Sequence, residues 1–223
     1  VYKRQIINNK TSGTITLNAN DATFTGTAAD VAAKFAGGLV GTQTGAVTIT
    51  DSATATIAAT TLSSIGEQTD GTVTVSNAIT ISGTTAELTA ALVTTGSLVV
   101  AGTAKLTFTD DPTGAQLAAI NPKTSGTITL ADTTQAFTGT ATELAAAFDG
   151  FGANALSGVI TMTGSAPTLA ELKTISDATS GAITLSNATF SLSGTSTDLA
   201  AALSGNFSNY TGNVTVTDAN PSA

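Results

Sequence analysis

Aspartate side chains recur at the ends of alternating apolar–threonine segments in this chain of 223 residues. Carboxylates in such positions could supply oxygen ligands to calcium, which takes roughly six to eight of them. The dense Asp/Gly repeat of calcium-binding β-rolls is missing, however, and one of the segments ends in glycine, at Gly164. The alternative is that these side chains hydrogen-bond the backbone of their own turns. The weak candidates for a calcium site are Asp51, Asp110, Asp111 and Asp218.

Other kinds of catalytic chemistry have little support in the sequence. The chain contains neither histidine nor cysteine, so the commonest acid–base and nucleophilic groups are missing, as are disulfides and thiolate metal ligands. Five of the fifteen acidic residues lie at expected helix starts, and no glycine-rich phosphate-binding loop follows a strand. We therefore predict a non-enzymatic protein, and we assign no catalytic or cofactor-binding residue.

Threonine pairs separated by one residue form the most repetitive pattern in the chain. Stacked in register, they would form flat threonine ladders that resemble the ice-binding faces of some antifreeze solenoids. The alternative is that threonine, a good strand residue, fills the solvent-facing side of the strands. Ala182 interrupts one of the expected ladders. The pairs are Thr14/Thr16, Thr48/Thr50, Thr72/Thr74, Thr107/Thr109, Thr127/Thr129, Thr161/Thr163 and Thr215/Thr217.

These threonines belong to a longer block that recurs four times along the chain. Its clearest phrase is Thr-x-Gly followed by an alternating strand, which occupies residues 11–17, 69–75, 124–130 and 179–185. A period of about 55 residues is typical of arrays in which each unit buries its apolar face against the next. The predicted units are residues 6–52, which is truncated, 53–111, 112–165 and 166–220, with 221–223 opening a further unit.

Each unit carries two predicted helices, although only Ile7 of the second helix remains in the truncated first unit. Each unit also carries a second alternating strand, called the alternating strand below, at residues 47–51, 106–110, 160–164 and 214–218. A threonine followed three residues later by an acid or glutamine has the spacing of a capping box. Apolar residues four apart then form one buried stripe on the first helix. The expected caps are Thr27/Asp30, Thr84/Glu87, Thr113/Gln116, Thr140/Glu143, Thr168/Glu171 and Thr195/Asp198. The expected apolar pairs are Val31/Phe35, Leu88/Leu92, Leu144/Phe148 and Leu199/Leu203 in the first helix, and Leu62/Ile65, Leu117/Ile120 and Leu172/Ile175 in the second.

Strands separated by short helices favour parallel pairing through right-handed crossovers. The sequence therefore predicts an α/β solenoid of about four units with parallel sheets, in which corresponding strands of successive units lie side by side. The alternative is a right-handed β-solenoid with helical corners.

Composition limits the partners. Seven basic residues against fifteen acidic ones give a net charge of −8, which disfavours nucleic acid and anionic membrane surfaces. No apolar stretch reaches the roughly 20 residues of a membrane-spanning helix. The acidic, threonine-rich, lysine-poor composition points to an extracellular or cell-surface location.

Both ends suggest a piece of a longer protein. Residues 1–5 have no counterpart in the other units and resemble the translation of a transposon end used in sequencing, so we expect them to be non-native. The first unit starts in its middle, and residues 218–221 align with 164–167, where a new unit opens. We expect neighbouring repeats at both ends.

The phrases at residues 168–175, 179–185 and 213–218 resemble repeats of giant bacterial surface adhesins and hemolysin-like secreted proteins of marine and cyanobacterial lineages. The resemblance covers nearly the whole chain from Ile6. It implies an extracellular stalk or adhesive segment and transfers no functional residue. Our prediction is a structural or adhesive segment, and the alternative is an array that binds ice or glycan through its threonine faces.

Overall fold

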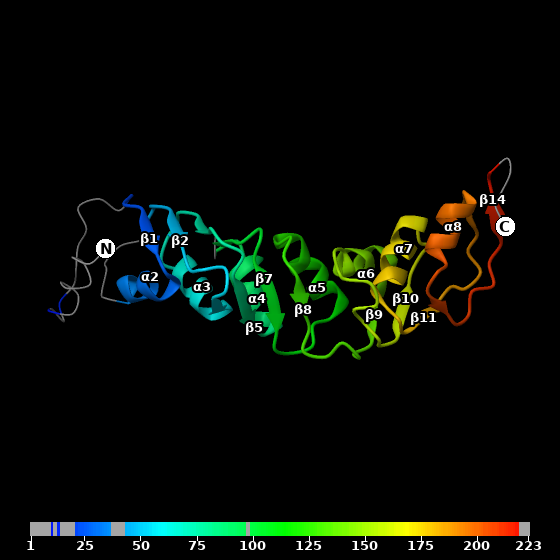
Figure 1. Cartoon of the computed structure of the whole chain (residues 1–223), viewed down its shortest axis with the longest axis horizontal. Helices are drawn as coiled ribbons and strands as arrows, with labels where there is room; N and C mark the ends of the chain where they lie inside the picture. Colours follow the sequence, from blue (N-terminus) through cyan, green and yellow to red (C-terminus); the bar gives the residue numbers. More distant parts are fainter. Residues whose placement is uncertain (1–9, 11–12, 14–20, 37–42, 97–98, 219–223) are drawn as a thin grey trace. The chain divides into compact units, whose positions relative to one another are not determined.

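The structure is a computed structural model that describes residue 10, residue 13 and residues 21–36, 43–96 and 99–218 (Figure 1). The described part has an α/β fold with seven α-helices and only parallel strand pairs, and its sheets form no closed barrel. The chain divides into two compact units, residues 1–110 with 123–129 and residues 111–122 with 130–223. From here on, the first and second unit are these two parts, and the sequence units of about 55 residues are called repeats. Residues 1–9, 11–12, 14–20 and 219–223 lie outside the described part, and with them Thr14, Thr16 and the expected start of a further unit.

The first unit contains two four-stranded parallel sheets, in the orders β1-β2-β4-β6 and β3-β5-β7-β8. Three helices connect the strands and pack against one another in sequence order. The strands are β1 (Phe24–Gly26), β2 (Val47–Ile49), β3 (Thr56–Ala58), β4 (Val73–Val75), β5 (Thr80–Gly83), β6 (Val99–Val100), β7 (Lys105–Phe108) and β8 (Ile128–Thr129). The helices are α2 (Ala28–Phe35), α3 (Ala59–Gly66) and α4 (Thr85–Leu92).

The second unit repeats this arrangement with one four-stranded sheet, in the order β9-β10-β11-β13, and a two-stranded sheet, β12-β14. Its four helices also pack in sequence order. The strands are β9 (Phe137–Thr140), β10 (Ile160–Thr163), β11 (Ala182–Leu185), β12 (Leu192–Gly194), β13 (Asn206–Phe207) and β14 (Val214–Val216). The helices are α5 (Gly114–Ile120), α6 (Ala141–Phe148), α7 (Leu169–Ala178) and α8 (Ser196–Ala202), and a 3-10 turn, η1 (Asn121–Lys123), follows α5.

The strand pairing corrects one expectation. Paired strands are separated along the chain by about half a repeat, as in Phe24 with Val47 and Val47 with Val73, instead of by a whole repeat. Each alternating strand (β2, β7 or β10) therefore has two different neighbours in its sheet. On one side lies the strand that precedes the first helix, and on the other side lies the strand of a Thr-x-Gly phrase. The expectation that corresponding strands lie side by side is wrong, because the chain returns to the same sheet twice within each repeat. Below, a turn means one such passage of the chain, about 25 residues long, from a strand to its parallel neighbour.

The helix caps agree closely with the sequence pattern. Full capping boxes form where glutamate or glutamine is the third helical residue. In α2 and α8 that residue is aspartate, Asp30 or Asp198, whose shorter side chain accepts from the capping threonine hydroxyl and not from the backbone N–H of that threonine. Helix α3 begins after Ala58 and has no side-chain cap.

The core is formed by the predicted apolar residues. Val31, Leu88 and Leu144 are fully buried on the inner sides of their helices, and the alternating strands direct residues such as Val47 and Ile49 inward. Threonines occupy the outer positions between them. The exceptions are β14, whose valines are exposed, and Leu203 of the last predicted helix pair, which is only half-buried.

Candidate functional site

Three of the four candidate calcium ligands lie at helix N-termini. Each follows an alternating strand by two residues and accepts a hydrogen bond from the first backbone N–H of a helix that precedes it in the chain. Asp51 accepts from Ala28 of α2, and Asp218 from Ser196 of α8, both at 2.7 Å. Their carboxylates thus face the positive end of a helix dipole, where a negative charge stabilises the helix.

Strand register explains this placement. Gly26, the last residue of β1, pairs with Ile49 of β2, so that two residues further on Ala28 lies beside Asp51. The same offset places Thr85 beside Asp110, since Gly83 pairs with Phe108. The recurring aspartate therefore accepts a hydrogen bond from the start of a helix in the adjacent turn. It does not cap the backbone next to it in the sequence, as the alternative to a calcium site had predicted.

Helix α4 shows how completely these groups are used. Asp110 Oδ1 accepts from both the backbone N–H and the hydroxyl of Thr85, each at 2.7 Å. Glu87 Oε2 accepts from the backbone N–H of Thr84 at 2.8 Å, and the Thr84 hydroxyl accepts in return from the Glu87 N–H at 3.3 Å. Two carboxylates and one hydroxyl thus accept from the N–H groups of Thr84, Thr85 and Glu87, three of the groups at the helix start that have no intrahelical partners.

The remaining candidate positions differ. Asp111 is exposed, and Gly164 stands where the third repeat lacks the aspartate, so α6 has no such carboxylate. In the described ranges, no three acidic side chains gather closely enough to hold a metal ion. The calcium site therefore stays a prediction, and the structure assigns the carboxylates of Asp51, Asp110 and Asp218 another role.

Hydrogen bonds lower the pKa values of three acidic side chains, and burial does not reverse the shift in any of them. The Ser196 side chain and backbone hold the pKa of Asp218 below its usual value, and Thr134 does the same for the pKa of Asp132. Burial opposes the shift at Glu171, but hydrogen bonds from Thr142 and Thr168 still lower its pKa. A general acid needs the opposite shift.

The sequence pattern did not reveal the role of the Thr-x-Gly phrase. The hydroxyl of Thr69 lies 2.9 Å from the carbonyl oxygen of Gly45 in the preceding turn, and it accepts from the N–H of Gly71 at 3.0 Å. A Cβ atom on Gly71 would lie only 2.4 Å from the Gly45 carbonyl oxygen. Threonine and glycine therefore allow two successive turns to approach closely. Thr124 makes the equivalent contact with Ala104, whereas Thr179 contacts Leu156, which corresponds to Gln43, a second acceptor of the Thr69 hydroxyl.

A second contact between turns also escaped the sequence analysis. Asn121, which is 8% exposed, donates from its side-chain amide to the carbonyl oxygens of Ala146, Ala147 and Asp149 at 2.8 to 3.1 Å. These carbonyls end α6 and lack intrahelical partners. One repeat later, Ser176 makes the equivalent bond to α8. The available signal was the polar residue that directly follows the isoleucine of the second helix, after Ile120 and again after Ile175.

The threonines do form ladders in register. Thr25, Thr48 and Thr74 are neighbours across β1, β2 and β4. In the second unit the neighbours are Thr138, Thr161 and Thr184, on β9, β10 and β11. The strands of these two sheets contain no charged residue. Each sheet therefore presents a regular row of uncharged hydroxyl groups.

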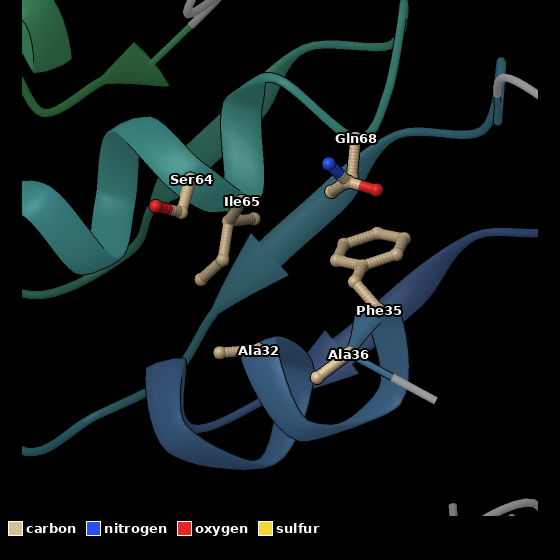
Figure 2. Close-up of a pocket in the computed structure, with 6 residues that line it drawn as sticks. All are labelled: Ala32, Phe35, Ala36, Ser64, Ile65 and Gln68. Atoms are coloured by element: carbon tan, nitrogen blue, oxygen red, sulfur yellow. The ribbon is translucent and has the colours of Figure 1, made fainter. Parts of the chain in front are cut away.

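A shallow pocket lies between α2 and the end of α3 (Figure 2). Its apolar lining residues are Ala32, Phe35, Ala36 and Ile65, and Ser64 and Gln68 are its polar residues. No titratable side chain lines it, so it offers no acid–base chemistry.

Comparison with protein-family models, curated proteins and solved structures found no match to this chain. Among the described helices, none combines the length and apolar character that crossing a bilayer requires.

Proposed function

We propose that the chain is a non-enzymatic structural or adhesive segment of a larger secreted or cell-surface repeat protein, built as an α/β solenoid of stacked turns. The observation that carries the proposal is the use of the recurring polar residues. Asp51, Asp110 and Asp218 each bond a helix of an adjacent turn. The residues that define the repeat therefore support stacking.

The site chemistry supports the same reading. An enzyme would concentrate reactive groups in one cleft. Here the recurring carboxylates are spread over several helix ends, and the pocket in Figure 2 is lined without any titratable group. The acidic, lysine-poor composition fits a location outside the cell. Neighbouring repeats of the same protein would be the main partners of this segment.

Single-molecule force measurement tests this proposal. A solenoid pulled from its ends should unravel by turns, and one turn of about 25 residues contributes roughly 80–90 Å of extended chain. We expect successive length increments of this size or small multiples of it. A single increment that releases the whole described chain would contradict a stacked array.

The hydroxyl ladders favour a second candidate function, the binding of ordered water at an ice surface. Neighbouring strands are about 4.8 Å apart and alternate residues of one strand are about 6.7 Å apart, so the threonines form a regular grid. The Thr184 and Ser208 hydroxyl oxygens, 3.2 Å apart, extend the grid to the residue that follows β13. A rigid, uncharged grid presents hydroxyl groups at the repeated spacing that a crystalline surface requires.

Thermal hysteresis separates this candidate from a purely structural role. Micromolar protein should depress the freezing point, and Thr161→Tyr at the centre of the grid should abolish the effect. Thr133→Tyr, at an exposed position outside the strands, is the matched control and should retain it. No effect of the unmodified chain on ice growth would rule out ice binding, and retention on insoluble polysaccharide would then assign the face to glycan.

A further inference from the structure

Asn187 is an exposed asparagine in the loop between β11 and β12. Together with Thr189 it forms the pattern Asn-x-Thr, which is the acceptor pattern for N-linked glycosylation. Backbone hydrogen bonds of 2.9 Å join this loop to the preceding turn, at Met162, and to the following turn, at Thr211. Asn187 is therefore exposed even though its loop has a described neighbour on each side.

Thr189 holds the side-chain amide of Asn187 by its oxygen. Asn187 Oδ1 accepts from the backbone N–H of Thr189 at 3.2 Å and from the Thr189 hydroxyl at 3.0 Å. The amide nitrogen Nδ2 carries two further donors, and over the residues that the structure describes it makes no hydrogen bond. The hydroxyl that the acceptor pattern requires thus lies on the amide itself, and the nitrogen is left accessible.

Three other Asn-x-Ser/Thr patterns in the described residues lack this geometry. They begin at Asn206, Asn209 and Asn213. Both polar atoms of the Asn209 amide bond the backbone of Leu185, with Nδ2 donating at 2.8 Å and Oδ1 accepting at 3.0 Å. The hydroxyl of Thr211 bonds the carbonyl of Ala188 instead of the Asn209 amide. In the part of the chain that the structure describes, only the pattern at Asn187 has its hydroxyl on its own asparagine.

The corresponding loops of other repeats separate the local structure from the acceptor chemistry. In the third repeat, Asp132 accepts from the N–H and the hydroxyl of Thr134, at 2.7 and 2.6 Å. In the second repeat, the Asn77 amide donates to the carbonyl of Asp51 at 2.7 Å, and isoleucine stands two residues later. The local bonds around Thr134 therefore need no glycan. The fourth repeat differs because Asn187 adds an accessible nitrogen to the same arrangement.

We propose that Asn187 is a site of N-linked glycosylation. Its Nδ2 atom attacks the anomeric carbon of a sugar that is activated as a glycosyl diphosphate ester, and a carbon–nitrogen bond forms. The bond from that carbon to the diphosphate oxygen breaks, the diphosphate ester leaves with the electron pair, and one amide proton passes to a base of the glycosyltransferase. The sugar donor and the transferase come from outside this chain. The modification goes beyond the proposed structural role and does not depend on it.

Glycosyl transfer to the folded full chain tests the proposal. The chain is incubated with a soluble N-glycosyltransferase and UDP-glucose, and mass spectrometry of its peptides locates each added hexose. We expect a hexose on Asn187 and none on Asn209, because the Asn209 nitrogen already bonds the Leu185 carbonyl.

Three variants test the geometry. Thr189→Val should abolish the modification because it removes the hydroxyl, whereas Thr189→Ser should retain it. Asp132→Asn should gain a second hexose, because it places an amide in the equivalent loop. Circular dichroism confirms that the variants are folded. An unmodified Asn187, equal modification of Asn187 and Asn209, full modification of Thr189→Val, or no gain in Asp132→Asn would overturn the proposal. The force measurement would still report independently on the stacked array.

Discussion

Asp110 accepts two hydrogen bonds from Thr85, which lies 25 positions earlier in the chain, one from the backbone N–H and one from the hydroxyl. The carboxylate thereby ties the end of β7 to the start of α4. Equivalent bonds join Asp51 to Ala28 and Asp218 to Ser196. An aspartate that follows an alternating strand is thus a recurring connection between adjacent turns.

Replacing Asp110 with alanine should lower the free energy of unfolding by about 1–2 kcal/mol, because both Thr85 donors lose their partner. The exposed neighbour Asp111 provides the control, and Asp111→Ala should change the stability by less than about 0.5 kcal/mol. Urea unfolding measures both values. Equal effects of the two substitutions would show that the bonds to Thr85 do not contribute.

Gly71→Ala should destabilise the first unit by about 1–3 kcal/mol, because the added methyl group must displace the Gly45 carbonyl. Gly102 is a matched control, since a Cβ atom there would meet no atom within 4 Å. Gly102→Ala should therefore have little effect on the melting temperature. A similar melting temperature for the two variants would refute the close stacking of turns.

Asn121→Ala should cost about 1–3 kcal/mol, because carbonyl groups at the end of α6 lose their shared donor. Ser176→Ala removes a single bond of 3.1 Å and should cost less. Hydrogen exchange should show faster exchange of α6 amides in the first variant and of α8 amides in the second. Exchange that changes in neither helix would contradict these contacts.

Acid should destabilise the protein through the hydrogen-bonded carboxylates. Hydrogen bonds lower the pKa values of Asp218 and, against the effect of burial, of Glu171 in the folded state, so protons bind more tightly to the unfolded chain. Their contribution is complete above about pH 5 and is lost as the pH falls through the lowered values, below about pH 4. Unfolding midpoints between about pH 2 and 7 measure this. Asp218→Asn should flatten the profile, and an unchanged slope would contradict the assignment.

Local features of the fold could be predicted from the sequence, whereas contacts between turns could not. The cap formed by Thr84 and Glu87 depends on residues three positions apart, and the alternation in β2 on residues two apart. The bond between Asp51 and Ala28 depends on which strands pair, and the period of the repeat suggested the wrong partners. Once Gly26 is known to lie beside Ile49, the role of Asp51 follows from the register.

Three short strands were also missed. β3, β6 and β13 contain two or three residues each and lack a clear alternating pattern. Their extended conformation is defined by the neighbouring strand with which they pair. Local propensity alone is a weak guide to such segments.

Each repeat stacks as two turns, so that neighbouring strands come from successive half-repeats. Disulfide trapping tests this arrangement most directly. The chain contains no cysteine that could interfere. Thr48 and Thr74 are neighbours on β2 and β4, whereas Thr107 occupies the position on β7 that corresponds to Thr48 one repeat later. Adjacent parallel strands bring Cα atoms within the range that a disulfide requires. We predict that mild oxidation will join the pair in Thr48→Cys/Thr74→Cys and will leave Thr48→Cys/Thr107→Cys reduced, and the reverse result would contradict the account.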